Sequence, residues 1–151
     1  MDVVGAVASI LQIIHIGTKI CVRINDFRQT TGKLPKAYSG LQLEIPILLD
    51  ILRITQIDID TGQLSDSDKK VLGPVIEDAL EQFKTYEETI TKALPKKGDS
   101  GFKKGWKGFV SLKYESKIKD AVVTIKGYIQ TISNHTIASE RNRNLGMFLL
   151  H

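Results

Sequence analysis

The chain has 151 residues, of which 42% are hydrophobic and 25% are charged, and its formal net charge is +4. This length suits one domain with its own core, and this hydrophobic content excludes an intrinsically disordered chain. The single cysteine, Cys21, excludes an internal disulfide, favours a reducing compartment and is expected to be a buried structural thiol.

The N-terminal segment predicts an unusually apolar helix over about residues 3–28. Apolar residues with the spacing of one helix face are Val3, Val7, Ile10, Ile14, Cys21 and Ile24. Further apolar residues on its other sides are Val4, Ala6, Leu11, Ile13, Ile16 and Ile20. A helix that is hydrophobic nearly all round is typical of a central, enclosed helix or of one that seeks a membrane.

Two membrane signals are incomplete in this segment. No basic residue precedes the apolar stretch, so we read no secretory signal peptide. The uncharged run over residues 3–18 is shorter than the roughly 20 apolar residues of a spanning helix.

The same spacing predicts three more helices. The second begins near Pro35, which suits a first helical turn, contains Pro46 and ends at about Ile57. The third starts at about Ser65, whose side chain can cap it, and ends before Pro95. The last runs over about residues 114–138, and a short helix is slightly favoured over a loop for residues 102–112.

These elements predict an all-α fold, an antiparallel bundle of four to five helices with a hydrophobic N-terminal helix. Residues 1–140 are expected to form the domain. Residues 141–151 are expected to form a tail whose apolar end, residues 145–151, either packs on the bundle or, as we favour, begins a linker to a further domain.

No catalytic centre is predicted. The glycines between residues 101 and 108 lack the strand and hydroxyl of a phosphate loop. His15, His135 and His151 lie far apart, without an acidic partner at helical spacing or a second thiol, so neither a metal site nor a nucleophilic triad is expected. We therefore predict a protein that is not an enzyme and needs no cofactor.

A lysine-rich segment over residues 96–119 is the one concentrated charge feature. Its candidate contacts for a lipid headgroup or another anion are Lys96, Lys97, Lys103, Lys104, Trp106, Lys107 and Lys113. A solvated loop whose aromatic rings cover the core is the plainest interpretation. An anionic membrane is the second, because lysines with aromatic rings suit its surface. A nucleic acid is the third, disfavoured because the segment has no arginine.

Three stretches resemble the SesA family. They are Val3-Val4-Gly5-Ala6-Val7-Ala8-Ser9-Ile10, Gly32-Lys33-Leu34-Pro35-Lys36-Ala37 and Val71-Leu72-Gly73-Pro74-Val75-Ile76-Glu77. Ser133-Asn134-His135 is similar as well. The resemblance covers about residues 1–140.

The resemblance implies an N-terminal signalling domain of a fungal NOD-like receptor with a NACHT or P-loop NTPase domain, related to HeLo and HeLo-like domains. It implies a cytoplasmic protein, recruited to the plasma membrane, that acts in programmed cell death or heterokaryon incompatibility through self-oligomerisation. Under this hypothesis the membrane-inserting residues are Val3, Val4, Val7, Ile10, Leu11, Ile13, Ile14 and Ile16. The alternatives are a protein-interaction adaptor without membrane activity and a nucleic-acid-binding bundle.

Overall fold

The computed structural model describes residues 3–94 and 112–149, with side chains for residues 5–94 and 112–136. The described residues form four long helices: α1 (Val3–Thr31), α2 (Lys36–Asp60), α3 (Asp66–Ala93) and α5 (Glu115–Leu149). No strand occurs in these ranges. The predicted all-α bundle with a hydrophobic N-terminal helix is therefore confirmed.

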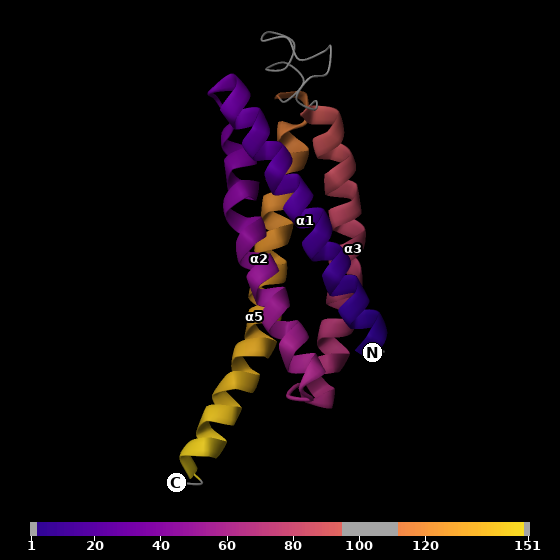
Figure 1. Ribbon diagram of the computed structural model, residues 1–151, viewed down its shortest axis with the longest axis vertical. Coiled ribbons are helices and arrows are strands. Elements are labelled where there is room, and N and C mark those ends of the chain that lie inside the picture. Colours follow the sequence, from indigo (N-terminus) through magenta and orange to yellow (C-terminus); the bar gives the residue numbers. More distant parts are fainter. Residues whose placement is uncertain (1–2, 95–111, 150–151) are drawn as a thin grey trace.

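Consecutive helices run in opposite directions along the long axis of the molecule (Figure 1). Helix α1 packs against α2 and α3, and α5 packs against the same two helices. Helices α1 and α5 thus occupy opposite corners of the bundle. The core between the four helices is apolar, with fully buried side chains that include Ile10, Ile24, Tyr38, Leu52, Phe83 and Ile125.

The helices end or begin at residues whose types favour helix ends. Gly32 and Gly62, just after α1 and α2, have φ angles of +70° and +69°, a region that glycine enters without steric cost. The Ser65 hydroxyl accepts a hydrogen bond from the Asp68 amide at 3.1 Å and so caps α3. Short connections between α1, α2 and α3 follow from these caps.

The last helix is longer than expected. It was predicted to end at about Ala138, but α5 continues to Leu149, and its C-terminal part extends beyond the rest of the bundle (Figure 1). The apolar repeat stops near Ile132, yet the following Ala138, Glu140 and Arg141 favour helix, and no proline interrupts them. Most of the predicted tail is therefore helical. The helix or loop expected over residues 102–112 lies, apart from Leu112, outside the described residues.

Candidate functional site

The residues predicted to enter a membrane lie on α1 with very different exposures. Ile10 and Ile13 are completely buried in the core. Val7, Ile14 and Ile16 are half-buried against it, and Leu11 is 51% exposed. Val3 and Val4 belong to the first turn of α1, and their side chains lie outside the described set.

Of the two interpretations of the apolar first helix, an enclosed helix or one that seeks a membrane, full enclosure is wrong. Leu11 and Val22 are 51% and 55% exposed, and Gln12 and His15 are exposed as well. The reason is geometric: α1 occupies a corner of the bundle, so α2 and α3 cover one side of it and the other side faces water. Enclosure of α1 would need further helices around it, and apolar residues on all its sides do not provide them.

Helix α1 nonetheless has the length and apolar character of a membrane-crossing helix. Within the described part of the chain it is the one helix long and apolar enough to span, over Gly5–Thr31, and 28% of an apolar 18-residue stretch within it is buried. The uncharged run alone is too short, but the helix continues through Lys19, whose long side chain can reach toward a polar boundary. Length and composition therefore permit a span.

The inner side of α1 sits closely on its neighbours. Gly17 is buried where α1 meets α2, and a β-carbon there would lie 3.2 Å from Ile45 Cγ2. On the α3 side, Arg23 Nη1 donates a hydrogen bond to the Leu94 carbonyl oxygen at 3.1 Å. Lys19 Nζ lies 3.8 Å from Glu87 Oε2, an exposed pair of small energetic weight. Apolar packing therefore dominates the attachment of α1.

Cys21 lies on the same helix as a free, half-buried thiol. Burial raises the pKa of this thiol from 9.0 to about 11, because the thiolate would lose hydration. The expectation of a structural thiol agrees with this environment, since reactive cysteines have lowered pKa values.

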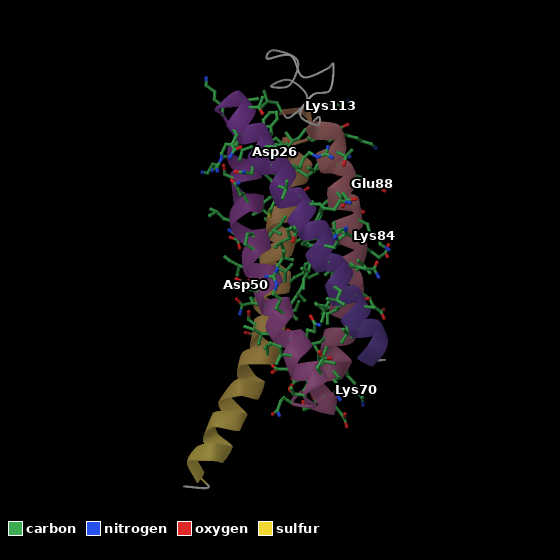
Figure 2. All side chains as sticks on the ribbon, viewed as in Figure 1. Asp26, Asp50, Lys70, Lys84, Glu88 and Lys113 are labelled. Carbon is green, nitrogen blue, oxygen red and sulfur yellow. The ribbon has the colours of Figure 1, made fainter. Side chains whose placement is uncertain are left out.

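Most of the predicted anion-binding residues lie outside the described part of the chain: Lys96, Lys97, Lys103, Lys104, Trp106 and Lys107. Lys113 is described and lies at the end of the bundle where α5 begins (Figure 2). Its Nζ is 5.7 Å from the centre of the Tyr114 ring, and Lys117 Nζ is 5.8 Å from it. Two cations therefore share one aromatic ring, a contact typical of a cation–π pair.

A polar contact that the sequence did not predict joins α5 to α3 at the other end. His135 Nδ1 lies 2.6 Å from Asp68 Oδ1, and the Ser65 hydroxyl donates to Asp68 Oδ2 at 2.8 Å. The carboxylate stands between the serine and the histidine, whereas a nucleophilic triad needs the histidine in the middle. This cluster therefore ties two helices together and does not activate the serine.

Buried polar groups continue next to this contact. The hydroxyls of Thr55 on α2 and Thr136 on α5 share a hydrogen bond of 3.0 Å, and both side chains are buried. Asp58, one turn further along α2, is 1% exposed. Side chains from α2, α3 and α5 thus form polar contacts at the end of the bundle where α2 meets α3.

A groove on the surface of the bundle lies between two of the helices. The groove, of about 370 Å³ between α3 and α5, is lined by Pro74, Val75, Asp78, Thr124, Gly127, Tyr128 and Thr131. The Tyr128 hydroxyl donates a hydrogen bond to Asp78 there, and burial together with this bond raises the pKa of Tyr128. Within residues 5–94 and 112–136, no three His, Cys, Asp or Glu side chains are grouped as metal ligands.

Comparison with known protein families identifies the family of the chain. The model of the SesA family, described as an N-terminal domain on NACHT and P-loop NTPases, matches residues 7–132. No curated protein and no solved structure matches the chain. The matched range begins inside α1 and ends inside α5, so it covers α2 and α3 completely and α1 and α5 in part.

Proposed function

The chain belongs to the SesA family of N-terminal domains on NACHT and other P-loop NTPases, and we propose that it is the non-enzymatic signalling domain of such a receptor. It oligomerises on activation and directs α1 from the cytoplasm into the plasma membrane. The result is programmed cell death or heterokaryon incompatibility. The NTPase part of the receptor supplies the regulated assembly.

The observation that carries this proposal is the character of α1. Its span Gly5–Thr31 has 27 residues, about 40 Å of helix, against about 30 Å of hydrocarbon in a bilayer. Its outer side already presents Leu11 and Val22, while release from the bundle would add Ile10 and Ile13. A released α1 would therefore be stable only in lipid or against other copies.

Polar residues of α1 support insertion as a group of helices. Gln12, His15 and Lys19 recur at helical spacing and are all exposed on the outer side of α1. In a single helix these residues would face hydrocarbon, which is costly. Several copies can instead turn them toward one another, and this explains why assembly would precede insertion.

Dye release from anionic liposomes tests the proposal. Ile10→Asp is unsuitable, because Ile10 is 0% exposed and a buried charge would unfold the bundle. Leu11→Asp is the better variant, because Leu11 is half exposed, and Val123→Asp is the matched control on α5, where Val123 is 70% exposed. The wild-type chain and Val123→Asp should release dye, and Leu11→Asp should release at least about tenfold less.

Two other results would overturn the membrane mechanism. If the wild-type chain assembles but leaves vesicles intact, the domain is an adaptor that acts through helix surfaces. If Leu11→Asp and Val123→Asp release dye equally, leakage does not depend on α1. Circular dichroism of each variant confirms that the bundle is folded, so neither result can be attributed to unfolding.

A further inference from the structure

Helix α2 carries a second apolar face, which points away from the core. Four large side chains on it are exposed: Leu43 by 69%, Ile47 by 47%, Ile54 by 41% and Ile57 by 59%. Asp50 lies between them, so the five positions alternate in the spacing that a helix uses to contact another helix. We call these positions the α2 stripe.

The residues of the α2 stripe do not contribute to the core of the bundle. The opposite side of α2 provides the core with Leu41, Ile45, Leu48 and Leu52, each 0% exposed. Single exposed apolar residues are ordinary on protein surfaces, but four of them aligned on one helix face form a patch of the kind that binds a partner.

We infer that the α2 stripe is a self-association surface on which α2 of a second copy of this chain packs in antiparallel orientation. The inference deepens the proposed function and rests on it, because it supplies the surface through which the domains assemble. The occupant is a second copy because the stripe, together with Arg53 beside it, is complementary to itself in charge and in the order of its apolar residues.

Charge selects the orientation. Asp50 on α2 (labelled in Figure 2) is 75% exposed, and Arg53 Nη1 lies 2.9 Å from its Oδ1 in the single chain, with Arg53 50% exposed. If two α2 helices run antiparallel and are centred between residues 51 and 52, Arg53 of each copy lies beside Asp50 of the other. In a parallel, in-register pair Asp50 would instead lie beside Asp50 of the other copy and Arg53 beside Arg53, and like charges repel.

The apolar residues agree with this register. With the same centre, Ile47 of one copy and Ile57 of the other lie within one residue of each other, about 1.5 Å along the helix axis, and the reverse contact forms at the other end. A twofold interface requires such reciprocal contacts, since both copies present the same surface. Two isoleucine pairs would then flank two reciprocal ion pairs.

Disulfide trapping tests the register, in a Cys21→Ala background that removes the natural thiol. Ile47→Cys and Ile57→Cys proteins, when mixed and oxidised, should give a disulfide-linked dimer. Neither variant alone should do so, because its two thiols would lie about 15 Å apart along the helix, beyond disulfide reach. Crosslinking of each variant alone, but not of the mixture, would overturn the antiparallel arrangement.

Sedimentation equilibrium tests the association itself. The wild-type chain should form a dimer, Arg53→Asp should raise the dissociation constant at least about tenfold, and the exchange Asp50→Arg with Arg53→Asp should restore it. All of these residues are exposed, so the fold tolerates the changes. A wild-type chain that stays monomeric at millimolar concentration overturns the inference, and so does an unchanged dimer in the Arg53→Asp variant.

The two proposals fail separately. Leu11→Asp should still dimerise, because Leu11 lies on α1 and outside the α2 stripe. Dimers without dye release would contradict the membrane mechanism alone. Dye release by a chain that stays monomeric, with Ile57→Asp weakening its sedimentation with liposomes, would assign the α2 stripe to lipid and overturn the self-association surface, while insertion of α1 would stand.

Discussion

Gly17 of α1 lies so close to Leu49 of α2 that a β-carbon on residue 17 would come within 3.0 Å of Leu49 Cδ2. Such a contact is tighter than nine in ten real β-carbon contacts, so glycine at this position lets the two helices pack closely without displacing Leu49. The contact lies within the segment that the proposed function requires to be released, and it can be altered without adding charge.

Gly17→Leu should separate α1 from α2. We expect the free energy of unfolding to fall by about 1–3 kcal/mol, as is usual when a packed interface is overfilled, with the change measured by urea denaturation. The same variant should release dye from liposomes faster than the wild-type chain. Gly127→Leu is the control, because a β-carbon at Gly127 meets nothing within 4 Å. Equal stability of the two variants would contradict the close contact.

The contact between His135 and Asp68 should stabilise the packing of α5 against the beginning of α3. His135→Ala is expected to lower the free energy of unfolding by about 1–2 kcal/mol, because it removes a partner from a half-buried carboxylate. His15→Ala, a substitution at an exposed position, should change it by less than about 0.5 kcal/mol. A thermodynamic cycle with Asp68→Asn measures the coupling, and additive effects would show that the two side chains act independently.

Thr55 and Thr136 offer a test of buried hydroxyl pairing. Thr55→Val leaves the Thr136 hydroxyl buried without this partner, so we expect a loss of about 1–3 kcal/mol. Replacing both residues by valine removes both polar groups and should recover most of that loss, because an apolar pair of the same shape fits the site. A double variant less stable than Thr55→Val would show that the hydroxyls serve another contact.

Stability should fall in alkaline solution. Burial raises the pKa of Cys21 from 9.0 to about 11, and burial also raises the pKa values of Tyr38 and Tyr128 above 10.0. Above pH 9 the unfolded chain therefore loses protons that the folded chain retains, which favours unfolding. These groups should leave the free energy of unfolding unchanged between about pH 7 and pH 9 and decrease it above pH 9. Cys21→Ala should reduce the decrease between pH 9 and 11, and an identical slope would contradict the raised pKa of this thiol.

The helices were predictable because each has apolar residues at helical spacing and a recognisable end. Ser65 caps α3 as its position suggested, and Gly32 ends α1 in the left-handed conformation that glycine permits. Both features depend on neighbours along the chain, so the sequence alone contains them.

Contacts between distant residues were not predictable in the same way. Asp68 and His135 are separated by 67 positions, and neither belongs to a motif that demands the other. The exposure of Leu11 also depends on which helices surround α1, a property of topology and not of hydrophobic pattern. The α2 stripe was overlooked because a second apolar face on the same helix is masked by the stronger inner one.

Release of α1 from the bundle is tested most directly by a reversible disulfide between α1 and α2. Gly17→Cys and Leu49→Cys in a Cys21→Ala chain place two thiols where α1 and α2 meet, so oxidation should tie α1 to the bundle. The oxidised protein should leave anionic liposomes intact, and a reductant should restore dye release to the level of the same variant kept reduced. Equal dye release from the oxidised and the reduced protein would contradict the account.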